Sequence, residues 1–130
     1  MNFLKDIAII IPCYNAIKTI TDTLYSIAIQ SIKDKCQVYI CNDCDGNSYD
    51  DIISQFKNTL DITYFTLPTN KGAGQARQYG IDNSVEPYIV FSDSDDVFTS
   101  PFAIENLYET IKRNDLDIVS GEFTEELRKN

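Results

Sequence analysis

Three carboxylates at the end of a short apolar run are the strongest chemical signal in the sequence. Asp93, Asp95 and Asp96 follow residues 88–91, whose apolar character is typical of a buried strand. Carboxylates this close repel one another, and a hard divalent cation with oxygen ligands relieves that repulsion. We therefore predict an Mg²⁺ or Mn²⁺ site here. The alternative is a solvated acidic turn in which Asp96 or Ser100 caps the following helix.

A glycine-rich stretch at residues 70–77 is a second candidate site. Its sequence is Asn-Lys-Gly-Ala-Gly-Gln-Ala-Arg, so Gly72 and Gly74 precede a helical pattern and Arg77 stands one turn into it. Such a loop presents backbone amides to a phosphate, and the helix dipole adds to the attraction. It is not a P-loop, and it is not a dinucleotide fingerprint because Arg77 stands at the third glycine position. A plain glycine turn with a surface arginine is the alternative.

Asp43 follows the second apolar run of the chain and is a third candidate. In nucleotide-binding α/β sheets, an acidic residue at the end of the second strand receives a ribose or a base edge. The alternative is a turn-forming aspartate, because residues 42–47 are Asn-Asp-Cys-Asp-Gly-Asn and favour a turn by composition.

Strand-like apolar runs alternate with segments of helical periodicity. We predict strands at 7–11, 36–41, 62–67, 88–91 and 116–119, and helices at 17–31, 51–56, 72–81 and from Pro101 onward. Ile17 opens the apolar face of the first helix, and Phe102 opens that of the last. The alternation predicts an α/β fold with a mostly parallel, Rossmann-like sheet flanked by helices. Residues 1–130 are expected to form one domain, with 122–130 as a charged tail.

Four polar or glycine-rich stretches follow the first four predicted strands, at 12–15, 42–45, 70–77 and 93–96. The carboxyl ends of parallel strands meet at one edge of a sheet, and ligands bind in the crevice there. We therefore expect the four stretches to line a single site.

Composition excludes several classes of function. The chain has no histidine, which excludes Ser-His-Asp and Cys-His nucleophiles, histidine-ligated metals and a histidine base. Its 11 basic and 20 acidic residues give a net charge of −9, which predicts no nucleic-acid partner. An anionic ligand then needs backbone amides, a well-placed arginine or a divalent metal. The sequence contains no apolar run long enough to be a transmembrane segment and no export signal, which predicts a cytoplasmic location.

The four cysteines, Cys13, Cys36, Cys41 and Cys44, are expected to be free thiols. Residues 41–44 match Cys-x-x-Cys, but a zinc site needs two further ligands and the sequence has no second such pair. A redox pair of the thioredoxin type opens a helix, whereas this pair closes a predicted strand.

Taken in order along the chain, these motifs resemble those of the family 2 glycosyltransferases, which have the GT-A fold. Residues 7–15, ending in Pro-Cys-Tyr-Asn, are similar to the family's first strand and its Pro-x-Tyr/Phe-Asn turn. Residues 38–43 resemble its second strand ending in Asp. Residues 70–80 resemble its Asn-x-Gly…Ala-Arg-x-x-Gly segment, and residues 88–96, followed by Pro101, resemble the strand with the D-x-D metal motif.

The resemblance implies a UDP-sugar donor and an Mn²⁺ or Mg²⁺ cofactor. The implied nucleotide-sugar-binding residues are Pro12, Tyr14, Asn15, Asp43, Asn70, Gly72, Arg77, Asp93 and Ser94, and the implied metal ligands are Asp95 and Asp96. Asp43 would hydrogen-bond the uracil or ribose, Arg77 would face the base or the diphosphate, and Asp93 would lie under the ribose or sugar. The metal would stabilise charge on the departing nucleoside diphosphate.

The resemblance also implies an inverting transfer to a glycan, lipid or protein acceptor. The family's catalytic base and acceptor-binding half follow the last predicted strand, and the carboxylates Glu122, Glu125 and Glu126 match no base motif. The chain is therefore interpreted as a donor-binding half, whose exposed edge predicts a homodimer. The alternatives are a non-catalytic sugar-nucleotide-binding module and a haloacid-dehalogenase-type phosphatase, since residues 93–97 also fit that family's D-x-D string.

Overall fold

The computed structural model describes residues 5–115, so the strand predicted at 116–119 and the charged tail 122–130 lie outside the described residues. Four strands form one sheet in the order β3-β2-β1-β4, and all the pairings are parallel. The strands are β1 (Ile7–Cys13), β2 (Cys36–Asn42), β3 (Asp61–Thr66) and β4 (Tyr88–Phe91). The predicted parallel α/β sheet is confirmed.

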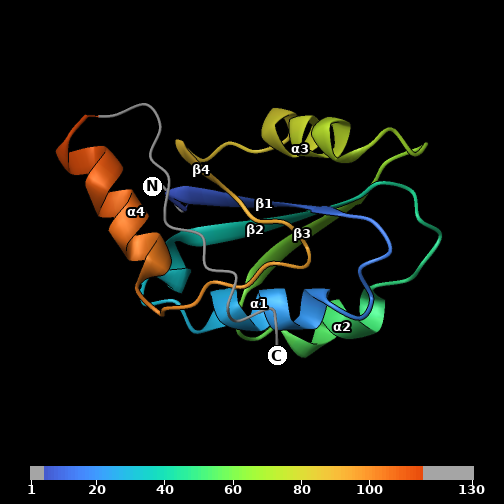
Figure 1. The fold of residues 1–130 in the computed structure, drawn as a ribbon, viewed down its shortest axis with the longest axis horizontal. Coiled ribbons are helices and arrows are strands. Elements are labelled where there is room, and N and C mark those ends of the chain that lie inside the picture. The colour runs from blue at the N-terminus through green and yellow to red at the C-terminus, as the bar shows by residue number, and fades with distance from the viewer. Residues whose placement is uncertain (1–4, 116–130) are drawn as a thin grey trace.

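Helices cover both faces of this sheet (Figure 1). They are α1 (Ile20–Ala28), α2 (Asp50–Gln55), α3 (Ala73–Asp82) and α4 (Ala103–Arg113), with a short 3-10 helix, η1 (Lys33–Lys35), before β2. Helices α1 and α2 lie on one face and α3 on the other, while α4 lies near the amino end of β1. No helix within residues 5–115 combines the length and the apolar character needed to cross a membrane.

Strand β1 is the centre of the core, because every one of its residues is buried. Ile7, Ile9 and Ile11 point to one face and join the larger core formed with α1, α2 and α4. Ala8 and Ile10 point to the opposite face, toward α3. This two-sided burial explains why the sequence of β1 is continuously apolar instead of alternating.

Helix α3 lies unusually close to the sheet at Gly80. A Cβ atom built on Gly80 would lie 2.7 Å from Cγ2 of Ile10 and 3.1 Å from Sγ of Cys41. The absence of a side chain at this position therefore sets the distance of α3 from β1 and β2, and with it the position of the amino end of α3.

Two helices begin later than predicted. Helix α1 begins at Ile20, and Ile17 lies in the preceding turn, where its side chain is 39% exposed. Helix α4 begins at Ala103, and Phe102, predicted to open its apolar face, is 53% exposed. The buried residues of α4 are Ile104 and Tyr108, and Leu107 and Ile111 on the same face are half-buried.

The four cysteines are free thiols, and three of them are buried. Burial raises the pKa of Cys13 and of Cys41 to about 11 and that of Cys36 to about 12. Cys44 is exposed, so it differs from Cys41, its partner in the Cys-x-x-Cys pattern, in access to solvent. The three buried thiols therefore stay protonated and unreactive near neutral pH.

Candidate functional site

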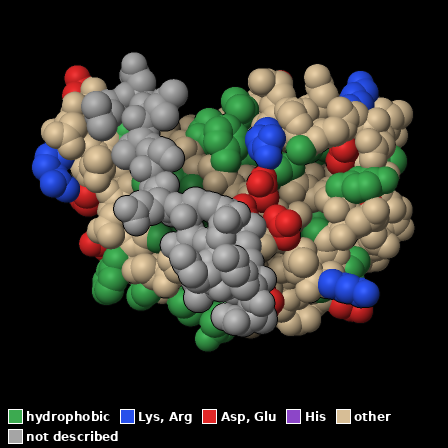
Figure 2. Space-filling model, viewed as in Figure 1, with side chains coloured by type: hydrophobic (Ala, Val, Ile, Leu, Met, Phe, Trp, Pro, Cys, Tyr) green, Lys and Arg blue, Asp and Glu red, His purple; other side chains and the backbone are tan. Residues whose placement is uncertain are grey.

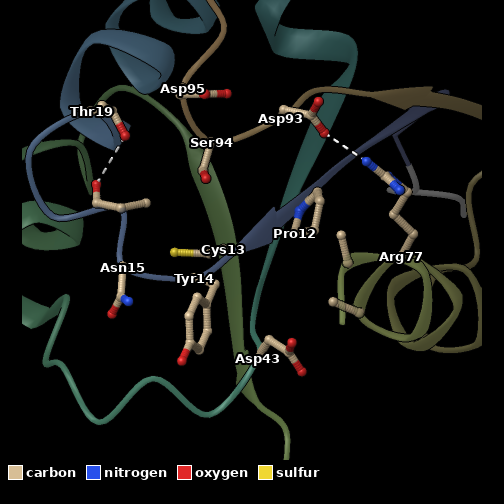
Figure 3. A pocket seen from close by; sticks show the side chains of 13 residues that line it. Pro12, Cys13, Tyr14, Asn15, Thr19, Asp43, Arg77, Asp93, Ser94 and Asp95 are labelled. Atoms are coloured by element: carbon tan, nitrogen blue, oxygen red, sulfur yellow. Dashed lines mark hydrogen bonds and ion pairs between the residues drawn. The ribbon is translucent and has the colours of Figure 1, made fainter. Parts of the chain in front are cut away.

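A cleft of about 350 Å³ lies at the carboxyl ends of β1, β2 and β4, beside the amino end of α3 (Figure 3). Most of the predicted site residues line it: Pro12, Tyr14, Asn15, Asp43, Arg77, Asp93, Ser94 and Asp95, together with Cys13, Ala16, Thr19, Ala73 and Ala76. All four predicted stretches thus contribute side chains, and the glycine-rich stretch does so through Ala73, Ala76 and Arg77 of α3. The cleft lies at the sheet edge at which ligands bind in open α/β folds.

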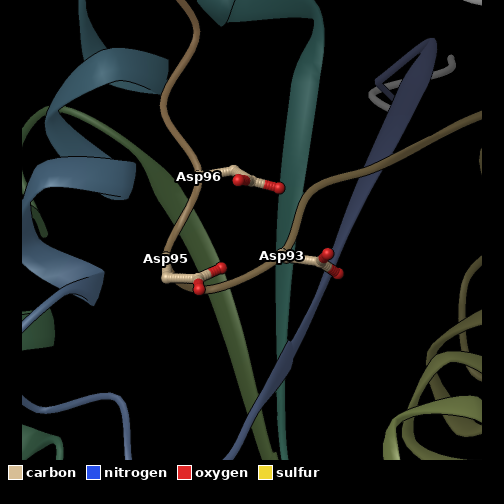
Figure 4. Close-up of side chains that lie close together, drawn as sticks. All are labelled: Asp93, Asp95 and Asp96. Atoms are coloured by element: carbon tan, nitrogen blue, oxygen red, sulfur yellow. The ribbon is translucent and has the colours of Figure 1, made fainter. Parts of the chain in front are cut away.

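Asp93, Asp95 and Asp96 cluster at one side of the cleft (Figure 4). One carboxylate oxygen from each lies within 4.8 Å of the others, and within residues 5–115 these three form a group suited to holding a metal ion. Asp93 and Asp95 also line the cleft, whereas Asp96 does not and is half-buried. Figure 2 shows acidic side chains gathered beside a basic one near the centre of this face.

Arg77 pairs with Asp93 across the cleft. The guanidinium Nη2 lies 2.8 Å from Oδ1 of Asp93, and the ion pair joins α3 to the turn that follows β4 (Figure 3). Both side chains are partly exposed. The lining holds three carboxylates against one guanidinium, so the cleft by itself carries a net negative charge.

Asp43 ties the end of β2 to the glycine-rich stretch. Its side chain is 3% exposed, Oδ1 accepts the amide of Lys71 at 2.8 Å, and Oδ2 accepts that of Gly72 at 2.7 Å. Gly72 has a φ of 95°, a backbone conformation that favours glycine. Asn70 and Gly72 are exposed and do not line the cleft, so their direct contact with a donor stays a prediction.

Asp45 and Tyr49, which were not predicted as site residues, hold the turn after β1 through hydrogen bonds. Oδ2 of Asp45 accepts the amide of Asn15 at 2.8 Å and the hydroxyl of Tyr49 at 2.5 Å. The same hydroxyl accepts the amide of Ala16 at 3.1 Å. Asn15 has a φ of 52°, and this network fixes it in that strained conformation. The only sequence signal was a second aspartate in the 42–47 turn.

A row of buried polar residues on α1 and just after its end was also missed. Thr23, Ser26 and Gln30 are all nearly inaccessible to solvent and hydrogen-bond to the backbone of the segment that follows β4. Their spacing of three and four residues, within the apolar face of a helix, was a usable signal. Ser100, predicted as a cap of α4, accepts the amide of Phe102 through its hydroxyl but is not the residue that caps the helix.

This parallel sheet with a cleft at its carboxyl edge is the GT-A fold, as the comparisons with known proteins show. The family model described as "Glycosyl transferase family 2" matches residues 8–129. The chain therefore belongs to the family 2 glycosyltransferases. The phosphatase alternative is not supported by this assignment.

Similar proteins carry out glycosyl transfer in bacteria. Over 117 residues the chain is 26% identical to the processive diacylglycerol beta-glycosyltransferase of Mycoplasma genitalium, covering 88% of this chain and 34% of the relative. Over 91 residues it is 32% identical to the poly(ribitol-phosphate) beta-N-acetylglucosaminyltransferase TarS of Staphylococcus aureus, covering 68% of this chain and 16% of TarS. The chain thus spans about a third or less of the length of these relatives.

Solved structures show the same fold. The crystal structure of S. aureus TarS 1-349 in complex with UDP-GlcNAc has a TM-score of 0.78 and 25% identity, covering 92% of this chain and 36% of that one. The mannosyltransferase PcManGT of Pyrobaculum calidifontis, in complex with GDP-Man and Mn²⁺, has a TM-score of 0.75 and 18% identity, covering 84% of this chain and 33% of that one. At that identity the second likeness is evidence for the fold alone.

Proposed function

We propose that residues 1–130 are the nucleotide-sugar-binding unit of a metal-dependent glycosyltransferase. In this proposal a UDP-sugar donates its sugar, with inversion, to a glycan, lipid or protein acceptor. The observation that carries the proposal is the cluster of Asp93, Asp95 and Asp96 at the edge of the cleft. The TarS relative, whose structure holds UDP-GlcNAc, supports a uridine nucleotide as the donor carrier.

The acidic cluster fits a divalent cation by its donor chemistry. Its donors are carboxylate oxygens, which are the ligands that Mg²⁺ and Mn²⁺ prefer, and their mutual repulsion falls when a cation is shared. The lining carries three carboxylates against Arg77, so an anionic diphosphate is repelled unless positive charge is added. Asp95 and Asp96 would hold the metal, which when bound supplies Lewis-acid stabilisation of the leaving diphosphate.

Other residues of the cleft would bind and orient the donor. In our proposal, Tyr14, which is 51% exposed, borders the nucleotide together with Pro12 and Asn15. Asp43 holds the glycine-rich stretch and presents its remaining acceptor capacity to the base or ribose. Helix α3 begins without a side-chain cap beside the cleft, so its free amides favour a phosphate.

Arg77 and Asp93 would change partners when the donor binds. In the structure they neutralise each other. In our proposal, a diphosphate competes for the guanidinium while a ribose or sugar hydroxyl donates a hydrogen bond to Asp93, with Ser94 beside it. We assign the general base to none of the residues of the described chain, so the proposal for these residues concerns donor binding and departure of the diphosphate.

Isothermal titration of the 130-residue chain with UDP, with and without Mn²⁺, tests this proposal. The wild-type chain should bind UDP in Mn²⁺ and lose most of that affinity in EDTA. Asp95→Asn should bind as weakly in Mn²⁺ as the wild type does in EDTA. Asp50→Asn, which removes an exposed carboxylate at the start of α2, is the matched control and should bind normally. Equal affinity of the wild type and Asp95→Asn in Mn²⁺ would refute the metal assignment.

The same chain distinguishes an enzyme from a binding-only module. A transferase site hydrolyses its donor slowly in the absence of an acceptor, because water replaces the acceptor hydroxyl. Release of free sugar from UDP-sugars in Mn²⁺ supports the enzyme, whereas tight binding without release from any donor supports the module.

The homodimer remains a separate prediction. Strand β4 is at the edge of the described sheet, and its side chains Ile89 and Phe91 are 39% and 51% exposed. Exposed apolar side chains on an edge strand favour association. Light scattering should therefore report a dimer, and a monomer would contradict this prediction.

A further inference from the structure

Thr23, on the buried side of α1, hydrogen-bonds to the backbone of the acidic turn, residues 93–96. Its side chain is inaccessible to solvent, and its hydroxyl oxygen lies 3.1 Å from the carbonyl oxygen of Ser94 and 2.6 Å from that of Asp96. These two carbonyls flank Asp95 in the chain. A single hydroxyl, 71 residues earlier in the sequence, therefore fixes the backbone on both sides of a carboxylate that lines the cleft.

The other two residues of the polar row, Ser26 on α1 and Gln30 just after it, bind the same segment further along. Oγ of Ser26 accepts the amide of Phe98 at 3.1 Å, and Nε2 of Gln30 donates to the carbonyl of Ser100 at 2.8 Å. Oε1 of Gln30 accepts the amide of Ile104 at 3.1 Å. Thr23 is thus the member of the row that contacts the acidic turn, while Ser26 and Gln30 hold the chain that leads to α4. This division of contacts provides matched controls.

Contacts from outside the acidic turn help to keep its three carboxylates together. Asp93, Asp95 and Asp96 bring three carboxylates within a few ångströms, and Arg77 pairs with Asp93 from the other side of the cleft, so repulsion within the cluster still favours opening of the turn. One backbone hydrogen bond, from the amide of Asp96 to the carbonyl of Asp93 at 3.1 Å, closes the turn from within. The hydroxyl of Thr23 opposes the repulsion without adding charge, and its own burial keeps it from exchanging these partners for water.

We propose that Thr23 is a positioning residue that keeps the three carboxylates together for cation and donor binding. This inference rests on the proposed function for its consequence, but its structural content is independent of any ligand. Thr23→Val removes the hydroxyl and keeps the branched shape, whereas Thr23→Ser keeps the hydroxyl and removes a methyl group. Ser26→Ala is the control for the loss of a buried polar contact on the same helix.

Two measurements on the 130-residue chain test the proposal. Hydrogen exchange without metal should show amides of residues 94–97 exchanging on the order of tenfold faster in Thr23→Val, because the hydrogen bonding of the hydroxyl to the carbonyls on either side of Asp95 is lost. Manganese titration followed by electron paramagnetic resonance should show Mn²⁺ affinity falling on the order of tenfold in the same variant. Thr23→Ser should restore both readouts. Ser26→Ala should lower the melting temperature yet keep the Mn²⁺ affinity of the wild type.

The two measurements separate failure of this inference from failure of the proposed function. If wild-type protein binds no Mn²⁺, the metal assignment fails, and hydrogen exchange still decides whether Thr23 holds the turn. Wild-type exchange at residues 94–97 in Thr23→Val would overturn the inference, as would Mn²⁺ affinity in Ser26→Ala that falls as far as in Thr23→Val.

Discussion

Removing the hydroxyl of Tyr49 should destabilise the protein through the turn after β1. Tyr49 is 1% exposed, and its hydroxyl donates to Asp45 at 2.5 Å and accepts the amide of Ala16 at 3.1 Å. Tyr49→Phe keeps the ring and its packing but removes both contacts. Burial, followed by the hydrogen bond to Asp45, raises the pKa of Tyr49, so the hydroxyl is protonated at all working pH values.

The expected cost is about 2–3 kcal/mol of unfolding free energy, because a buried amide loses its partner and a carboxylate loses one donor. For a chain of this length that lowers the melting temperature by roughly 5–10 °C. The chemically identical change Tyr25→Phe is the control, since Tyr25 is 61% exposed and should shift the free energy by less than about 0.5 kcal/mol.

The loss should also depend on pH. Burial alone would raise the pKa of Asp45, but hydrogen bonds from Tyr49, Asn47, Asn15 and Asn42 outweigh it and lower the pKa below its usual value of 3.8. A lowered folded-state pKa gives stability that is fully present above the unfolded value and is lost as the pH falls toward the folded one. Tyr49→Phe should therefore flatten the decline in stability below about pH 4.

Guanidinium unfolding at pH 7 and between pH 2.5 and 4.5 measures both effects. If Tyr49→Phe destabilises the protein no more than Tyr25→Phe does, the hydrogen bonds of the Tyr49 hydroxyl do not stabilise the fold and this reasoning is refuted. Tyr49→Phe could instead lower the unfolding free energy strongly at pH 7 and leave its decline at acid pH unchanged. That result would show that the amide of Ala16, rather than the carboxylate of Asp45, is the important partner.

Three further changes give independent tests. Gly80→Ala should cost about 1–3 kcal/mol because its Cβ would meet Ile10, whereas Gly74→Ala, with open space around it, should be neutral or stabilising in chemical unfolding. A thiol reagent at pH 8 should modify Cys44 rapidly and the three buried cysteines only after denaturation, and fast reaction of all four would contradict the packing. Arg77→Gln should weaken UDP binding in titrations while changing the free energy of unfolding by less than about 1 kcal/mol, since its ion pair with Asp93 is partly exposed.

The sequence was sufficient to predict the sheet because its strands have unusually clear patterns. The apolar run of β1 and the short run of β4 each end in polar residues, which located both the strands and the edge where the cleft lies. Helix starts were less predictable. Ile17 and Phe102 continue the helical periodicity, yet both precede the first helical residue, because local turns set the start of a helix as much as its apolar face does.

The supporting contacts of the site were beyond sequence reasoning. Asp45 looks like an ordinary surface residue, since polar side chains in turns usually face water. The spacing of Thr23 indicates a buried polar side chain on a helix but does not identify its partners. The roles of Thr23 and Asp45 depend on partners 71 and 30 residues away in the chain, and those partners are backbone groups with no sequence signature. Asp43 was predicted as a contact for the nucleotide, and in the structure its carboxylate also accepts hydrogen bonds from the amides of Lys71 and Gly72.

A thermal melt of the 130-residue chain with UDP, ADP and GDP, each in Mn²⁺ and in EDTA, tests the central claim most directly. A ligand at about 100 times its Kd adds roughly 2.7 kcal/mol of stability, which gives a readily measured shift. The account predicts a shift with UDP in Mn²⁺ that disappears in EDTA and is smaller with the purine nucleotides. No shift with any nucleotide, or a UDP shift of equal size in EDTA, would contradict a metal-dependent UDP-sugar site formed by the acidic turn.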